Sequence, residues 1–233
     1  MEKRTSLVSR IFTWVLLALV VLAMFVPVFT VKAEVSVGSS KETVFSANVS
    51  TLDVLSVAFM SDEQKQDELN KLSKQRLEDI AKVVANGDAE ENAVKKVNGY
   101  SYMGKYALLN YFGSETDEKA LGIDTKTWLI LAAVVEILLL VCVALDLFFS
   151  YMCMQYDNVS LPRLVKSFGF LILVFGVGLM AIYMFTLRAK VLSVSVTTVM
   201  NVLAYIFAGI CVFLPIYECM VFKRRKSYMK KRK

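Results

Sequence analysis

The strongest constraint on the fold of this chain is that its apolar residues gather into four blocks, each near the length that crosses a lipid bilayer. A bilayer core about 30 Å thick needs a helix of roughly 20 mainly apolar residues. The 233-residue chain is 56% hydrophobic and 21% charged, with a mean hydropathy of +0.53. These values exclude a disordered or an ordinary soluble protein. The blocks are Ile11–Val31, Trp128–Tyr151, Phe168–Leu187 and Val199–Phe222.

We therefore expect an all-α polytopic membrane protein, a bundle of four transmembrane helices. A small, mainly helical α+β extracytoplasmic domain lies between the first two spans. The predicted order is an N-terminus at 1–10, a span at 11–31, the outer domain at 32–127, a span at 128–151, a link at 152–167, a span at 168–187, an outer loop at 188–198, a span at 199–222 and a tail at 223–233.

The first block has a second interpretation. A basic start, an apolar run and the small residues Val31 and Ala33 also match a secretory signal that is cleaved after Ala33. The run is longer than the apolar core of most signal peptides, which favours a retained membrane anchor.

Basic residues beside the blocks predict that both termini are cytoplasmic, because cytoplasmic flanks of spans are rich in Lys and Arg. A tail with no acidic residue follows the fourth block and is expected to contact anionic lipid. Its basic residues are Lys223, Arg224, Arg225, Lys226, Lys230, Lys231, Arg232 and Lys233. The net charge of +6 is thus an orientation signal. We expect the lipid bilayer, and not nucleic acid, to be its target.

Cysteine and histidine usage bears on the compartment and the chemistry. No cysteine lies between residues 32 and 127, so the outer segment has no disulfide framework, which favours a bacterial plasma membrane. The sequon Asn48-Val49-Ser50 and the basic C-terminal end suggest the alternative of a eukaryotic endoplasmic reticulum membrane. The chain lacks histidine and any Cys-x-x-Cys pair. We therefore predict no catalytic residue, no cofactor and no metal site.

Within the outer segment, two short strands are expected at 34–37 and 42–47, joined by a turn at Gly38-Ser39-Ser40. Residues 51–60 are ambiguous between strand and helix. Ser61 followed by Gln64 is a capping-box pattern, and it predicts a helix that ends at Asn86-Gly87.

A second short helix should then start with Asp88 and Glu91 as its capping residues and end at Asn98-Gly99. The tyrosine-rich stretch 100–112 has two interpretations. It packs near the membrane surface, where tyrosine is favoured, or it forms a recognition surface.

Four polar residues inside the predicted spans are the candidate functional residues: Glu136, Asp146, Asn201 and Glu218. A carboxylate at membrane depth costs several kcal/mol unless it is paired, protonated or wet. Helical spacing places these residues on two stripes that should face the bundle interior. The stripes are Ala132, Glu136, Leu139, Val143, Asp146 and Ser150 on the second span, and Asn201, Ala204, Ala208, Cys211, Pro215 and Glu218 on the fourth. Either the acids hold the helices and partners together, or they form an ion path.

Claudins and tetraspanins share the layout of four spans with a large first outer loop. The outer segment here has no tryptophan and no cysteine, so the residue signatures of both families are missing and no family is assigned. We predict a non-enzymatic membrane interaction protein, an accessory or assembly subunit with a membrane-protein partner or a second copy of itself. The alternative is an oligomeric ion- or proton-coupled transporter or channel component that uses the intramembrane carboxylates.

Overall fold

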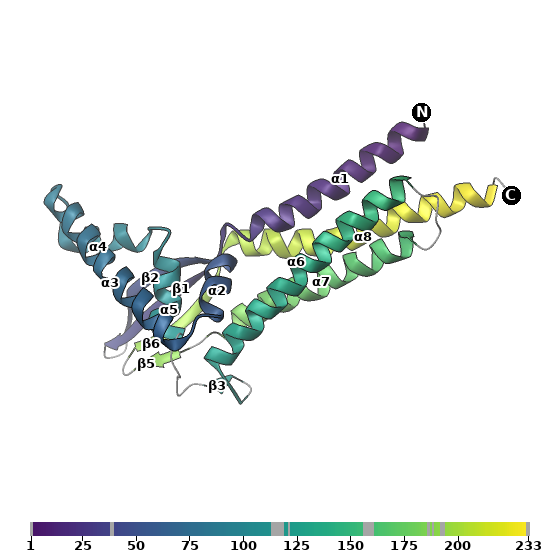
Figure 1. The fold of residues 1–233 in the computed structure, drawn as a ribbon. Helices are drawn as coiled ribbons and strands as arrows, with labels where there is room; N and C mark the ends of the chain where they lie inside the picture. The colour runs from purple at the N-terminus through teal and green to yellow at the C-terminus, as the bar shows by residue number, and fades with distance from the viewer. Residues whose placement is uncertain are drawn as a thin grey trace. The chain divides into compact units, whose positions relative to one another are not determined.

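The computed structural model describes residues 2–37, 40–112, 119–120, 122–155, 161–185, 187, 189–191 and 194–231, with side chains given from Val8 to Val221 at most. The elements are α1 (Glu2–Ala23), β1 (Pro27–Val37), β2 (Ser40–Ser50), α2 (Thr51–Ala58), α3 (Asp62–Ala85), α4 (Glu90–Asn98), α5 (Met103–Phe112), β3 (Lys119–Ala120), β4 (Ile123–Asp124), α6 (Thr125–Gln155), α7 (Leu161–Phe185), β5 (Ala189–Val191), β6 (Val194–Met200) and α8 (Val202–Lys231) (Figure 1).

The chain divides into two compact units. The bundle unit consists of Met1–Ala23, Val135–Met180 and Tyr205–Lys233, and the sheet unit of Met24–Val134 and Ala181–Ala204. The long helices α6, α7 and α8 contribute residues to both.

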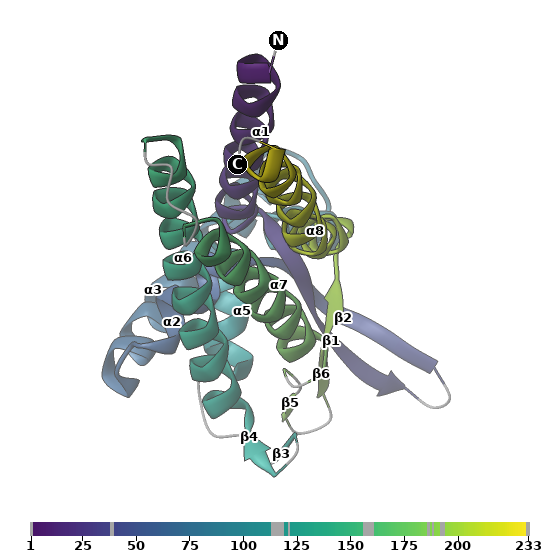
Figure 2. The same cartoon turned by 90° about the vertical axis from the view of Figure 1, so that its right-hand side faces the viewer.

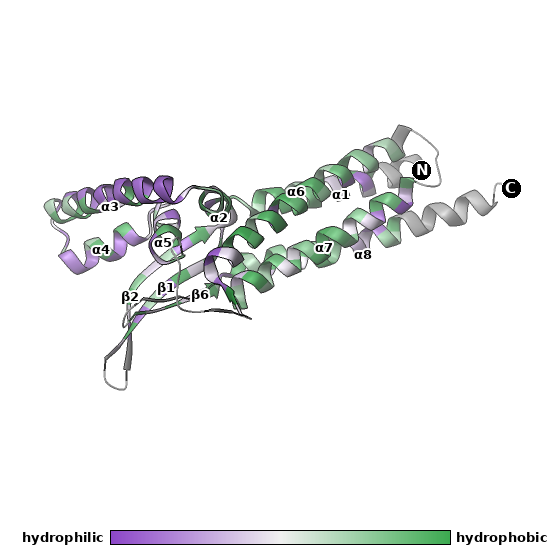
Figure 3. Ribbon diagram, turned by 60° about the horizontal axis from the view of Figure 1, so that its bottom comes forward, coloured by the Kyte–Doolittle hydropathy of each residue, from purple (hydrophilic) through white to green (hydrophobic). Residues whose placement is uncertain are grey.

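Three helices are long and apolar enough to cross a membrane: α6 over Thr125–Cys153, α7 over Leu161–Phe185 and α8 over Val202–Val221. They contain most of the second, third and fourth predicted blocks. Apolar residues run along α6 and α7, whereas α3 is mainly hydrophilic (Figure 3). At 1.5 Å per residue, the 29 residues of the α6 span measure about 43 Å. That length matches the hydrocarbon core together with both headgroup layers.

The first predicted span, 11–31, is wrong at its C-terminal end. α1 stops at Ala23, and residues 27–31 belong to strand β1. Pro27 has no N–H to continue a helix, and the β-branched residues after it favour a strand. The apolar part of α1, Val8–Ala23, extends about 24 Å, which is less than the roughly 30 Å of a bilayer core. Four spans are therefore not confirmed.

The same strand bears on the cleavage alternative. Ala33 is fully buried in β1, opposite Phe45 of β2 on one side and Val196 of β6 on the other. A cut after Ala33 would divide β1. Residues 27–33 would be removed, although they pair with β2 and β6.

The sheet unit is built on a four-stranded antiparallel sheet with the order β2-β1-β6-β5. The strands predicted at 34–37 and 42–47 are present and extend into the longer β1 and β2. Residues 38–39 of the predicted turn lie outside the described residues. Strands β5 and β6 occupy most of the predicted outer loop 188–198, and β6 also takes the first residues of the predicted fourth span. Strand β6 pairs with the central strand β1, and β5 pairs with β6. The valines and threonines of β6 favour the strand.

Helices α2 to α5 lie on one face of this sheet (Figures 2 and 3). Residues that alternate along the strands supply the buried face, namely Phe29, Val31 and Ala33 from β1 with Phe45, Ala47 and Val49 from β2. The ring of Phe45 lies 6.0 Å from Tyr106 and 5.6 Å from Tyr111, both on α5. Much of the tyrosine-rich stretch thus packs against the sheet. This gives those rings a structural role inside the unit.

The predicted helices of this unit are present with one difference in capping. Ser61 and Gln64 form the expected capping box at the start of α3. The ambiguous stretch 51–60 is mainly helix α2, capped by Ser50 and Asp53. The expected cap of α4 is wrong, because Ala89 occupies the N-cap without a side-chain bond. Asp88 instead accepts a bond from Lys96 at 3.4 Å. The Asp88 carboxylate therefore contacts Lys96 and does not cap the N-terminus of α4.

The links between the spans also differ from the prediction. The link 152–167 is helical over 152–155 and 161–167, which belong to α6 and α7. Residues 156–160 lie outside the described residues. The tail is helical as far as Lys231 in α8.

A glycine decides how closely α5 approaches the sheet. A Cβ at Gly104 would lie 2.5 Å from the carbonyl oxygen of Asn48 and 2.8 Å from Oδ2 of Asp53. The backbone oxygen cannot swing away, so we expect Gly104→Ala to lower the free energy of unfolding by about 1–3 kcal/mol. Denaturant unfolding of the full chain in detergent measures this. Gly178→Ala is the control, because its Cβ would meet nothing within 4 Å. Equal stability of the two variants would contradict this packing.

Candidate functional site

The most unusual feature of the bundle unit is a pair of carboxyl groups in its interior. Asp146 on α6 and Glu218 on α8 both have no exposed surface, and each lies close enough to act on the other. None of their four carboxyl oxygens has a hydrogen-bond partner among the described residues. Burying such groups without compensation is costly, so this pair is the candidate functional site of the bundle unit.

A glycine on the third span makes room for the pair. A Cβ at Gly169 of α7 would collide with the carboxyl group of Glu218, so only glycine fits there. Small residues are the usual means by which membrane helices approach each other closely. Gly176, seven residues later, faces Cys211 of α8 in the same way. The two glycines thus bring α7 against α8 at the level of Glu218 and again seven residues away, at Cys211.

The charged surroundings of the pair come from α7. Lys166, one turn before Gly169, is a basic residue whose positive charge acts on Glu218. Burial of an ionised carboxylate without compensation is costly in a bilayer. The ammonium group of Lys166 is a compensation that the bundle supplies from its own residues.

The predicted stripe on the second span is confirmed as a buried face. All six of its residues are buried: Ala132, Glu136, Leu139, Val143, Asp146 and Ser150. Glu136 has no exposed surface and lies ten residues before Asp146, which is about 15 Å along the helix. The two acids of α6 therefore share a face but sit at different depths.

Asn201 is placed differently from the prediction. It precedes α8 and lies just outside the span, in the sheet unit. Its backbone N–H donates to Val28 at 3.0 Å, and its side-chain amide donates to the carbonyl of Pro27 at 3.4 Å. Asn201 thus ties the end of β6 to the start of β1.

Helix α1 joins the bundle unit through contacts that the sequence did not indicate. The indole N–H of Trp14 donates to the hydroxyl of Ser150 on α6 at 3.3 Å. Tyr217 of α8 donates to the carbonyl of Ser9 at 3.2 Å, and its ring lies 4.9 Å from that of Phe12. In the sequence, the polar residue Ser150 on the predicted stripe of α6 was the one feature that pointed to a contact with another helix.

The sheet unit offers a different kind of surface. Polar side chains alternate with the buried ones and point to the face opposite the helices: Thr30, Lys32 and Glu34 on β1, Ser46 and Asn48 on β2, and Thr197 on β6. All are partly or fully exposed. The Thr30 hydroxyl lies 2.8 Å from Oδ1 of Asn48 and 2.7 Å from Oδ1 of Asn201, so it donates to one of them at a time. We call this surface the open sheet face.

Two further expectations concern the tail and metals. The side chains of the basic tail, residues 223–233, lie outside the description, so its lipid contact stays a prediction. Within the described part of the chain, no three Cys, Asp or Glu side chains come together as metal ligands would.

The fit between Gly169 and Glu218 can be tested by a double-mutant cycle. We expect Gly169→Ala to destabilise the full chain in detergent by about 1–3 kcal/mol, because the added methyl group displaces the carboxyl group. In a Glu218→Ala background the same change should cost much less, since the colliding group is gone. Thermal unfolding measures both. Costs that are the same in the two backgrounds would refute the fit.

Comparisons of the chain with models of protein families, with curated proteins and with solved structures give no match.

Proposed function

We propose that this chain is a non-enzymatic membrane protein, an accessory or assembly subunit that binds a membrane-protein partner through the open sheet face. The observation that carries the proposal is the one-sided packing of the sheet, with helices α2 to α5 on one face only. The opposite face presents hydroxyl, amide, ammonium and carboxyl groups that are partly or fully exposed, within a few strand positions of each other. Such a mixture supports polar recognition of another protein.

The described surface of the spans suits lipid better than a polar partner. Residues on the outward sides of the spans are apolar and exposed, for example Leu131, Ile137 and Phe148 on α6. The three acids within the spans, Glu136, Asp146 and Glu218, are buried. The described polar groups that a partner can reach are therefore concentrated in the sheet unit.

The proposed setting is the plasma membrane of a bacterium, with both termini in the cytoplasm and the sheet unit outside. That orientation requires α1 to cross the membrane as a fourth span. Its bonds to Ser150 of α6 and from Tyr217 of α8 support a place for it beside the spans. A eukaryotic endoplasmic reticulum membrane is the alternative location.

The partner surface can be tested by site-specific photo-crosslinking in native membranes. Lys32 and Thr197 lie opposite each other on the open sheet face, so a photoreactive residue at either position should capture the same stoichiometric partner. Lys71 on α3 is the control, because its side chain is 72% exposed but lies on the helical side of the unit. Purification of the chain alone, or equal capture from position 71, would contradict the proposal.

The carboxyl pair favours a second candidate, an oligomeric proton- or ion-conducting component. Asp146 and Glu218 are neighbouring buried acids, and Glu136 is buried about 15 Å away along the same face of α6. Buried acids at such spacing resemble the steps of a proton relay.

For this candidate we expect proton flux into proteoliposomes to fall when Glu136 is replaced by Gln, because the amide cannot carry a proton. A pH-sensitive dye inside the vesicles measures the flux. Cys219→Ser is the control, since Cys219 is exposed next to Glu218. Unchanged flux in Glu136→Gln would rule this candidate out.

A further inference from the structure

Arg76 of α3 is a cation that lies against aromatic rings in the sheet unit. Its Cζ atom is 5.8 Å from the ring centre of Phe45 on β2 and 5.6 Å from that of Tyr106 on α5. Its charge also acts on the hydroxyl groups of Tyr102 and Tyr111. A guanidinium group suits such a place better than an ammonium group, because it is planar and more weakly hydrated.

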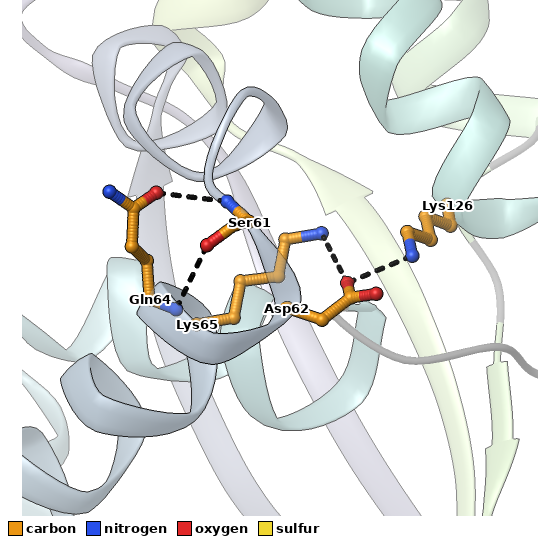
Figure 4. A network of polar contacts seen from close by, with 5 residues as sticks. All are labelled: Ser61, Asp62, Gln64, Lys65 and Lys126. Carbon is orange, nitrogen blue, oxygen red and sulfur yellow. Dashed lines mark hydrogen bonds and ion pairs between the residues drawn. The ribbon is translucent and has the colours of Figure 1, made fainter.

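Arg76 makes no ion pair within the part of the chain that the structure describes. Other basic groups of the sheet unit do meet a carboxylate. Lys65 and Lys126, for example, lie 3.7 Å and 2.9 Å from Oδ1 of Asp62 (Figure 4). Aromatic rings compensate a positive charge less completely than a carboxylate does, because a ring has no net charge.

The acids next to Arg76 on α3 are engaged or face elsewhere. Asp79, one turn later, contacts Lys82 at 3.3 Å and accepts a hydrogen bond from a tyrosine hydroxyl on the next helix. Glu78 is exposed and lies two residues after Arg76, so it projects from a different side of the helix. The charge of Arg76 is therefore open to a further carboxylate.

The three nitrogens of the Arg76 guanidinium have different surroundings. Nε is buried and has no hydrogen-bond partner among the described residues. Nη2 donates to Oδ1 of Asn98 at 3.5 Å, which is long for a hydrogen bond. Nη1 bonds to no described residue, yet it is not one of the buried atoms without a partner, so it reaches the surface. The group thus carries more N–H donors than its own chain engages.

The tyrosines beside Arg76 are also open to solvent. Tyr102, Tyr106 and Tyr111 are partly exposed, and Tyr100, whose ring lies 6.1 Å from that of Tyr102, is 37% exposed. The hydroxyl group of Tyr106 makes no hydrogen bond to a described residue. Tyrosine and arginine are the residue types that most often dominate binding at protein interfaces. We call Arg76, Tyr102, Tyr106 and Tyr111 the arginine–tyrosine surface.

We infer that the arginine–tyrosine surface binds a carboxylate group in an acidic segment of a protein partner. The rings hold the guanidinium plane in place, so the carboxylate meets fixed N–H donors and little side-chain entropy is lost on binding. It accepts hydrogen bonds from Nη1 of Arg76 and from the hydroxyl of Tyr106. These residues belong to α3 and α5, on the helical side of the sheet unit. Binding here does not depend on the open sheet face or on the carboxyl pair.

The test uses the purified full chain in neutral detergent with two synthetic peptides, tetraglutamate and tetraglutamine, each carrying a photoreactive group. After illumination and digestion, we expect tetraglutamate to label the stretch 100–112 and tetraglutamine to leave it unlabelled. The yield of this label at increasing tetraglutamate concentration gives the affinity of the surface. Because the label is read within 100–112, attraction of the acidic peptide to the basic tail does not enter the result.

The variants separate a specific site from general charge attraction. Arg76→Gln should weaken tetraglutamate binding about tenfold, since a charge-assisted hydrogen bond is lost. Tyr106→Phe keeps the ring but not the hydroxyl, and should weaken binding about threefold. Lys74→Gln is the matched control. It removes one positive charge from an exposed position of α3, two residues before Arg76, and should change binding by less than about twofold.

Three results would overturn the inference: equal labelling by tetraglutamine, equal losses in Arg76→Gln and Lys74→Gln, or labelling confined to the tail. If Arg76→Gln does not fold, Arg76→Lys and Tyr106→Phe decide the question. Arg76→Lys keeps the charge but lacks the planar set of donors, so it should also weaken binding. Unchanged affinity in both of these variants would contradict the inference.

Discussion

The arrangement of the sheet unit depends on the antiparallel pairing of β1 with β6. This pairing sets Phe29 opposite Met200 and Val35 opposite Val194, so it joins segments about 160 to 170 residues apart in the chain. Closing so long a loop costs conformational entropy, and the ladder of backbone bonds together with the buried face of the sheet offsets that cost. Asn201 extends the ladder by one residue through its bonds to Pro27 and Val28. These bonds hold the start of β1 next to the end of β6.

The bundle unit meets a different constraint, which is the cost of acidic groups away from water. Glu136, Asp146 and Glu218 all have no exposed surface. Asp146 and Glu218 lie beside each other, and Gly169 provides the volume that the Glu218 carboxyl group needs. An apolar pair of similar size would hold these helices together at least as well. The presence of two acids, Asp146 and Glu218, where apolar residues would pack as well is therefore the main argument for a proton-linked role beside the proposed assembly role.

The two units divide the chemistry of the chain between them. The acids within the spans are buried, while the sheet unit carries polar groups on its open sheet face. At the N-terminal end of the α6 span, Lys65 and Lys126 meet at the carboxylate of Asp62.

The sequence by itself determined those features that rest on local interactions. Spans α6, α7 and α8, the buried stripe of α6 and the capping box of α3 follow from residues within a few turns of each other. Only the tertiary structure decided the features that join distant residues. Residues 27–31 looked like the end of a span because they are apolar, yet strand partners near residues 47 and 198 make them β1. The roles of Asn201 and Gly169 likewise depend on residues that are distant in the sequence. The same holds for Lys126, which meets Lys65 at Asp62. Periodicity records which face of an element is buried, whereas the partner that covers it is set by the packing of the whole chain.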